Sequence, residues 1–221
     1  MISVQTLWLT LRDLTRKDNI GNYLQNDEFN RQVNLCQDII YDYHIDKRNE
    51  RVAREALVNF ENDPLITKVG DSYPLPVDYR DKIEAGLVVE GEDYPIPVHF
   101  TARDELAMSL SSPVRGPSLE RKVVLGRIRS TDIQIWPKVD NKLYFRYYSN
   151  PPAASREVTV DVDEIEEVYD SVSTVDLEWP EDLLSDFVDL MLLFKGVVIR
   201  DSSLIQWVQA RNAIEREIAH D

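Results

Sequence analysis

The sequence predicts an α+β protein in which a β-rich region is inserted into a helical body made from both chain ends. Two observations predict this class. Apolar residues recur every three or four positions near both ends, which is typical of amphipathic helices. Nine of the eleven prolines and five of the seven glycines lie between Pro64 and Pro180, among short segments of alternating apolar residues. We therefore expect a helical body of residues 1–62 and 178–221, and a sandwich or barrel-like β-rich insertion of residues 63–177.

The helical pattern predicts three helices before the insertion and two after it. Ser3 is placed to begin the first helix, and Ile20-Gly21 to end it. Gly196 separates the last two. The apolar positions that predict these helices are, in chain order, Val4, Leu7, Leu11 and Leu14; Phe29, Val33, Cys36, Ile40 and Tyr43; Val52, Ala53, Ala56, Leu57 and Phe60; Leu183, Leu184, Phe187, Val188, Met191 and Leu192; and Leu204, Ile205, Val208 and Ile214.

The insertion is predicted to contain six strands and one short helix. Thr101 and Asp104 have the spacing of a capping box ahead of a helix at Glu105–Leu110. The expected strands are Leu65–Val69, Ile83–Val89, Val123–Ile128, Thr131–Trp136, Leu143–Tyr148 and Val158–Val162.

Length and composition predict a soluble protein made in a reducing cytoplasm. The 221 residues are 43% hydrophobic, which is enough for a core. The single cysteine, Cys36, cannot form an internal disulfide. The first residues lack the basic start and apolar run of a signal peptide, and no apolar run reaches the roughly 20 residues of a membrane-spanning helix.

An acidic run dominates the charge of the chain. The formal net charge is −15, and the stretch from Glu157 to Asp189 holds thirteen acidic residues without Lys or Arg. Such a charge argues against nonspecific binding of nucleic acid phosphates. The run is a solvated face that keeps the protein soluble, or a surface that docks to a basic partner.

A short basic segment contrasts with this acidity. Between residues 115 and 129 only Glu120 opposes five cations, which are Arg115, Arg121, Lys122, Arg127 and Arg129. The segment could contact the acidic run of a neighbour and set register and partner choice. Alternatively, its charges protect exposed strand edges against aggregation.

Signatures of catalysis are missing from the sequence. The three histidines are scattered without metal-ligand spacing, and the common nucleotide-binding and hydrolase motifs are absent. The stretch beginning at Asp161 starts like a calcium loop, but Ile165 takes a ligand position and Glu166 replaces the required glycine. Paired carboxylates carry no signal among 40 acidic residues. We expect no enzymatic activity, no cofactor and no metal.

Three stretches of the sequence, taken in order, form a recognisable set. The first is the helix junction Ile20–Leu24 with Asn26–Asn30, and the second is Tyr73–Arg80, with its Leu-Pro-x-Asp-Tyr pattern. The third joins Ile133–Pro137 to Leu143–Pro152. Together they resemble the head-to-tail connector or adaptor proteins of tailed phages, in particular the neck ring proteins of podovirus-type and crAss-like phages, except that Trp136 replaces the more usual tyrosine.

This resemblance implies a structural subunit without an active site. Such a subunit forms a closed ring, commonly twelve-fold, that extends the DNA channel below the portal and joins it to the tail. In that setting the acidic run is also a candidate channel wall that repels DNA, and the basic segment could meet the acidic run of a neighbouring copy or of the portal. The candidate wall residues are Asp161, Asp163, Glu164, Glu166 and Glu167. The implied partners are further copies of the chain, the portal and other neck or tail proteins, and DNA passes through without sequence-specific binding. The implied location is the virion, after synthesis in the host cytoplasm. An acidic module that recruits a basic protein is the alternative.

Alternation within Leu143–Tyr148 predicts one buried and one exposed face. Leu143, Phe145 and Tyr147 are expected in the core, opposite Ile133 and Ile135 of a neighbouring strand, with Asp140-Asn141 in the hairpin between them. The other face would present Tyr144, Arg146 and Tyr148, a combination of residue types that is enriched at protein interfaces.

Overall fold

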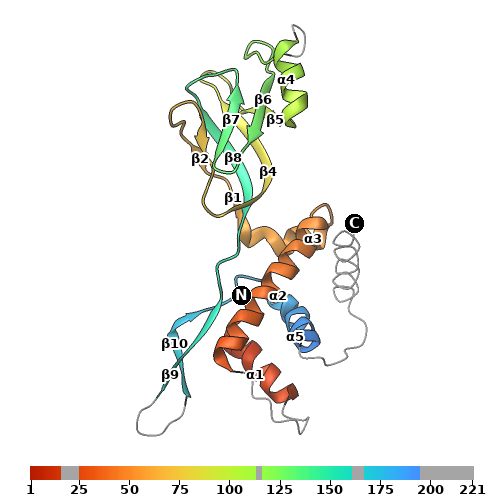
Figure 1. Cartoon of the computed structure of the whole chain (residues 1–221), viewed down its shortest axis with the longest axis vertical. Coiled ribbons are helices and arrows are strands. Elements are labelled where there is room, and N and C mark those ends of the chain that lie inside the picture. The colour runs from red at the N-terminus through yellow and green to blue at the C-terminus, as the bar shows by residue number, and fades with distance from the viewer. Residues whose placement is uncertain (16–24, 113–115, 161–166, 195–221) are drawn as a thin grey trace. The chain divides into compact units, whose positions relative to one another are not determined.

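The chain has an α+β fold (Figure 1): along the sequence, helices lie towards both chain ends, and the strands of a large curled sheet come between them. The computed structural model describes residues 1–15, 25–112, 116–160 and 167–194. The chain divides into two compact units, Met1–Asn59 with Pro151–Asp221 (unit 1) and Phe60–Asn150 (unit 2). The predicted helix end at Ile20-Gly21 and the predicted helix around residues 204–214 lie outside the described residues.

Unit 1 contains the predicted amphipathic helices. These are α1 (Val4–Thr15), α2 (Asn26–Asp46), α3 (Arg51–Leu57) and α5 (Leu184–Phe194), the last preceded by the 3₁₀ turn η2 (Glu181–Leu183). Their apolar faces are buried much as the spacing predicts, although Val52 is 66% exposed. The buried positions include Leu7, Leu11, Phe29, Val33, Ile40, Leu57, Phe187 and Met191.

Trp179 lies fully buried in unit 1. Its ring meets Tyr41 and Phe187 edge-on, with ring centroids 6.1 Å and 6.2 Å away. A buried indole N–H needs an acceptor, and Nε1 donates to Oε1 of Gln37 at 3.2 Å. This explains why Gln37, a polar residue, is only 3% exposed on α2.

The same glutamine belongs to a row of side-chain amides along α2 that holds an extended segment of the chain. Asn34 accepts a hydrogen bond from the backbone N–H of Ala154 (2.9 Å) and donates to its carbonyl (2.8 Å). Asn30 does the same for Arg156, at 2.8 Å and 3.1 Å. Gln37 donates to the carbonyl of Pro152 at 2.9 Å. These amides supply the bonds that a neighbouring strand would otherwise make.

The pairing is possible because the axial spacing of residues on a helix nearly matches that of alternate residues in an extended chain. Residues four apart on a helix are separated by about 6 Å along the axis, and alternate residues of an extended chain by about 6.7 Å. Asn30 and Asn34 therefore stay in step with Arg156 and Ala154, which run antiparallel to the helix. We call these side chains, with Asn26 and Gln37, the amide row.

Arg156 fixes the end of this segment. Its side chain is buried, donates to Gln5 (2.8 Å) and Asn26 (2.9 Å), and lies 4.5 Å from the centroid of the Trp8 ring. The chain then forms a hairpin of β9 (Ser155–Val160) and β10 (Glu167–Val175). Both strands belong to unit 1, so the boundary falls after residue 150 and differs from the predicted boundary at 177. The boundary falls there because the amide row binds the backbone of the chain from Pro152 onward.

The residues that follow this hairpin also form hydrogen bonds with the start of α1. Ile2 and Leu177 exchange two backbone hydrogen bonds of 3.1 Å. Oδ1 of Asp176 accepts from the N–H of Val4 at 2.9 Å. The predicted cap, Ser3, accepts from Thr6 at a longer 3.5 Å.

Unit 2 contains one curled, mixed sheet. Its strand order is β1-β8-β4-β5-β6-β7-β3, with β2 also pairing with β8, and β5 and β6 are parallel while the other pairs are antiparallel. The strands are β1 (Glu61–Asn62), β2 (Leu65–Ile66), β3 (Tyr73–Pro74), β4 (Tyr79–Val88), β5 (Ile96–Phe100), β6 (Val124–Ile128), β7 (Asp132–Trp136) and β8 (Lys142–Ser149). Alternation did not predict β1, β3 or β5, since β1 and β3 have two residues each and β5 contains Pro97.

The predicted faces of β8 are confirmed on the core side. Leu143, Phe145 and Tyr147 lie in one cluster with Ile133 and Ile135. The predicted hairpin of these two strands is wrong, because β8 pairs with β4, β1 and β2, whereas β7 pairs with β6 and β3. Their apolar residues meet across the curled sheet instead of side by side.

The short helix of unit 2, α4 (Arg103–Ser111), follows β5. The predicted capping box is wrong: Ala102 occupies the N-cap and no side chain caps it. The Thr101 hydroxyl is buried without a hydrogen-bond partner among the described residues. Its backbone N–H instead donates to the carbonyl of Gly126 at 3.1 Å, which ties the start of the helix to β6.

We predict that Phe145→Ala lowers the free energy of unfolding by about 3–5 kcal/mol, the usual cost of truncating a fully buried phenylalanine. Phe145 is 0% exposed and its ring lies 5.5 Å from Tyr147 and 5.8 Å from Tyr79. Chemical denaturation measures the change. Val77→Ala, at a fully exposed position, is the control. Equal effects of the two substitutions would contradict the assigned core face.

We further predict that Asn34→Ala destabilises the protein by about 1–3 kcal/mol, because it leaves the N–H and C=O of the buried Ala154 without these partners. Hydrogen exchange should show loss of protection in β9. Arg31→Ala, exposed on the same helix, should change stability by less than about 0.5 kcal/mol. An Asn34→Ala protein as stable as this control would show that the amide row is not needed.

Candidate interaction surfaces

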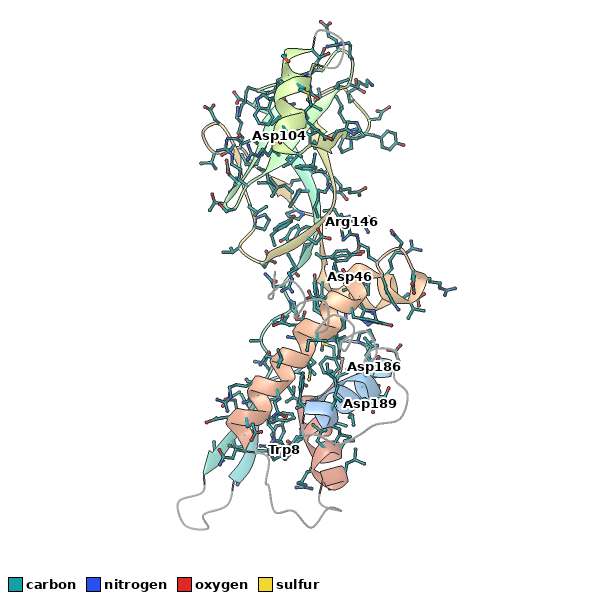
Figure 2. All side chains as sticks on the ribbon, turned by 45° about the vertical axis from the view of Figure 1, so that its right-hand side comes forward. Trp8, Asp46, Asp104, Arg146, Asp186 and Asp189 are labelled. Carbon is teal, nitrogen blue, oxygen red and sulfur yellow. The ribbon has the colours of Figure 1, made fainter. Side chains whose placement is uncertain are left out.

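The outer face of β8 contains a charged network around Arg146, which is labelled in Figure 2. Its guanidinium donates to Glu61 at 2.6 Å and to Glu84 at 3.5 Å. The hydrogen bond to Glu61 is the main reason that the pKa of Arg146 is raised. The Tyr144 hydroxyl donates to Glu84 at 3.4 Å. Arg146 therefore ties β8 to β1 and β4, and its side chain is 38% exposed.

Tyr148, expected on the same exposed stripe, is only 3% exposed. The edge strand β1 pairs at this position, with Glu61 opposite Tyr148. The Tyr148 hydroxyl lies 3.4 Å from Oε1 of Glu61. Alternation alone could not reveal this, because β1 has only two residues. The described surface thus offers Tyr144 and Arg146 to a partner, but not Tyr148.

In the first part of the basic segment, Arg121 and Lys122 form contacts within unit 2. Arg115 lies outside the described residues. Arg121 donates to the carbonyl of Gly116 at 2.9 Å. Lys122 has a positive φ of 54° and forms an ion pair with Glu92 at 2.5 Å. These two residues shape the loop before β6.

The second part of the segment lies on the β6–β7 hairpin. Val124, Ile133 and Ile135 point into the core, so alternation places Arg127 and Trp136 on the opposite, outer side. Arg127 pairs in register with Gln134, and Arg129 closes the turn through its N–H to the carbonyl of Asp132.

Lys138 adds a further cation to this side. Its Nζ lies 5.1 Å from the centroid of the Trp136 ring. We call Arg127, Arg129, Trp136 and Lys138 the basic hairpin face. Trp136 and Lys138 were not among the residues predicted for an interface, although the alternation in β7 places Trp136 on the side of Arg127.

The predicted channel-wall residues are mostly not described. Asp161, Asp163, Glu164 and Glu166 lie outside the described residues, and Glu167 begins β10 opposite Val160. Charge is nevertheless divided unequally between the two units. Unit 2 has 12 basic and 14 acidic residues, a formal charge of −2, and unit 1 therefore carries −13 of the total −15.

A described part of the acidic run lies on η2 and α5. Asp182, Asp186 and Asp189 are spaced i, i+4 and i+7, so they share one side of the helix; Figure 2 labels the last two. Burial raises the pKa of Asp186 and of Asp189, and repulsion from Asp189 and Asp182 raises that of Asp186 further. Acidic residues at a helix start are favoured by the helix dipole, but Asp189 lies beyond the first turn of α5. We call these three residues the acidic helix face.

His44 is a buried titratable group in unit 1. It is 4% exposed, and its Nδ1 has no hydrogen-bond partner among the described residues. Burial, with a smaller effect of Lys47, lowers the pKa of His44 to about 4. The imidazole is therefore neutral at pH 7 and packs as an aromatic ring, 5.9 Å from Trp179.

Within the described residues, no group of three His, Cys, Asp or Glu side chains is placed to hold a metal ion. A polar, open cavity of about 370 Å³ lies beside β4 and β5, lined by residues that include Lys82, Glu84 and Pro97. Tyr144 also lines it, and its hydroxyl is the one that donates to Glu84 at 3.4 Å.

No family model matches the chain, and no curated protein matches it.

Among the described helices, none is long and apolar enough to cross a membrane.

We predict that Arg146→Ala lowers the free energy of unfolding by about 1 kcal/mol, because it breaks a partly exposed ion pair with Glu61. Glu84→Ala should cost less, since its contact with Arg146 is longer and more exposed. Thermal unfolding of both variants provides the comparison. A larger loss in Glu84→Ala than in Arg146→Ala would contradict this ranking.

We also predict that acidification destabilises unit 1 through His44. Its pKa is about 4 in the folded chain and about 6.5 when unfolded, so the unfolded state binds the proton first. Stability should fall as the pH drops from about 6.5 to about 4, by up to about 3 kcal/mol. The raised pKa values of Asp186 and Asp189 act in the opposite sense. Comparing the parent with His44→Gln isolates the histidine, and parallel pH profiles would refute its role.

Proposed function

We propose that the chain is a non-enzymatic subunit of a tailed-phage head-to-tail connector, a ring that extends the DNA channel below the portal and joins it to the tail. The division of charge carries this proposal: unit 1 has −13 and unit 2 only −2. One chain thus presents two different surfaces, and a contact between unlike surfaces of neighbouring copies builds a closed ring when the rotation closes. Twelve copies is the number that the resemblance implies.

Residues in the stretches that resemble connector proteins form hydrogen bonds and a ring contact within unit 2. Asp78 accepts a hydrogen bond from the Tyr147 hydroxyl at 2.8 Å, and Tyr79 packs on Phe145. Burial and this hydrogen bond raise the pKa of Tyr147 to about 12. Asn150 donates to the carbonyl of Asp78 at 2.6 Å. These residues therefore brace the sheet where the chain leaves unit 2, a role consistent with a rigid structural subunit.

A strongly acidic subunit suits a channel through which DNA must slide. Carboxylates repel phosphates, and this keeps DNA from binding to the wall. Asp161, Asp163, Glu164, Glu166 and Glu167 remain the proposed wall residues. The partners we propose are further copies of the chain, the portal and other neck or tail proteins, and the location we propose is the virion.

An acidic module that recruits a basic protein is the second candidate. The charge of −13 on unit 1 favours it directly. The two proposals differ in stoichiometry, because a recruiting module binds its partner as a single copy or a small complex.

The test is assembly on the portal of the phage that encodes the chain. We predict that the purified chain is monomeric or weakly associated alone, because like charges repel, and forms rings when the portal is added. Analytical ultracentrifugation over a range of salt concentrations should show salt-dependent assembly. A chain that stays monomeric with the portal at every ionic strength would reject the connector function.

A further inference from the structure

We propose that the basic hairpin face of one copy binds the acidic helix face of a second copy of this chain. This inference rests on the proposed ring function and names the contact that would build the ring. Its two sides are Arg127, Arg129, Trp136 and Lys138 on β6–β7 of unit 2, and Asp182, Asp186 and Asp189 on η2–α5 of unit 1.

Two arginines of the basic hairpin face are left without a carboxylate partner by the described part of unit 2, while Lys138 donates to the carbonyl of Asp71 at 2.8 Å. Lys122 and Arg146 form ion pairs with carboxylates, whereas Arg127 and Arg129 form none within the described part of the chain. Trp136 is partly exposed between them and Lys138. Tryptophan with arginine is the combination on which protein interfaces concentrate their binding energy.

The acidic helix face carries uncompensated charge of the opposite sign. None of its three carboxylates forms an ion pair with another described residue. Asp186 is partly buried and lies near two other aspartates, which raises its pKa. A cationic partner would relieve this repulsion, so the charges of the two faces are complementary.

A second copy is the occupant that the charges favour. Nucleic acid would meet a chain with a formal charge of −15, and the basic hairpin face alone is too small to offset it. A second copy supplies the acidic helix face at the same concentration as the basic one. Because the two faces differ, the contact is heterologous and leaves one face of each copy open for the next.

The test traps this contact as a disulfide between two copies of the chain. The copies differ in size, so that a linked pair of unlike copies can be recognised. One copy carries Gln134→Cys in the basic hairpin face, and the other carries Ser185→Cys beside the aspartates of α5. The native Cys36 is buried, and burial raises the pKa of its thiol, so it does not compete. The control replaces Ser185→Cys by Arg31→Cys, exposed on α2. We expect disulfide-linked pairs to form at least ten times faster than in the control.

Charge reversal then tests the mechanism. Arg127→Glu with Arg129→Glu in the first copy should reduce trapping at least tenfold, and Asp182→Lys with Asp189→Lys in the second copy should restore it. Asp27→Lys with Glu50→Lys makes the same change in net charge elsewhere and should not restore it. Trapping equal to the cysteine control, or unaffected by charge reversal, would overturn the proposal.

The remaining outcomes separate this inference from the ring function. A chain with both cysteines that links only to itself would place the contact within one molecule and overturn the proposal. The trap needs no portal. Rings on the portal without trapping would reject this contact and keep the connector function, whereas trapping without rings would keep the contact and reject the connector function.

Discussion

The structure of unit 1 depends on the pairing between the amide row of α2 and the segment Pro152–Arg156. Asn26, Asn30, Asn34 and Gln37 bind the backbone of an extended chain that has no strand beside it on this side. An extended segment buried without such partners would cost about 1–3 kcal/mol for each unpaired group. The matching repeats of helix and strand allow the bonds to form at successive positions. They hold the returning chain against α2, so that Leu177, just after β10, pairs with Ile2 and Asp176 can cap α1.

This constraint also determines how charge is distributed. Because the chain joins unit 1 directly after Asn150, the whole run from Glu157 to Asp189 belongs to the helical unit. The β-rich unit keeps an almost balanced set of charges, of which some are paired internally, as Arg146 is with Glu61, and some are presented on the outer side of β6–β7. A single chain therefore has two chemically different surfaces, which is the requirement for a head-to-tail assembly.

Much of the fold could be predicted from the sequence, because apolar periodicity reports which side of an element is buried. The helix faces and the core face of β8 follow from it. Pairing partners do not, since Leu143 and Ile133 share a core whether their strands are adjacent or lie across a curled sheet. The burial of Tyr148 depends on the two-residue strand β1, and the place of β9–β10 depends on Asn30 and Asn34, whose spacing was visible but whose partners are more than a hundred residues away. Trp136 and Lys138 lie outside the basic run of residues 115–129, so a run of charge does not reveal them, whereas the faces of β6 and β7 do.

The central claim, that this chain assembles head to tail into a closed ring, is tested most directly by native mass spectrometry of the protein after assembly with the portal. A heterologous contact that closes predicts one dominant stoichiometry above two, with no larger species at higher protein concentration. Dimers as the final state would indicate a two-fold contact between like surfaces, and a series of ever longer oligomers would indicate a contact that does not close. Either result would contradict the account.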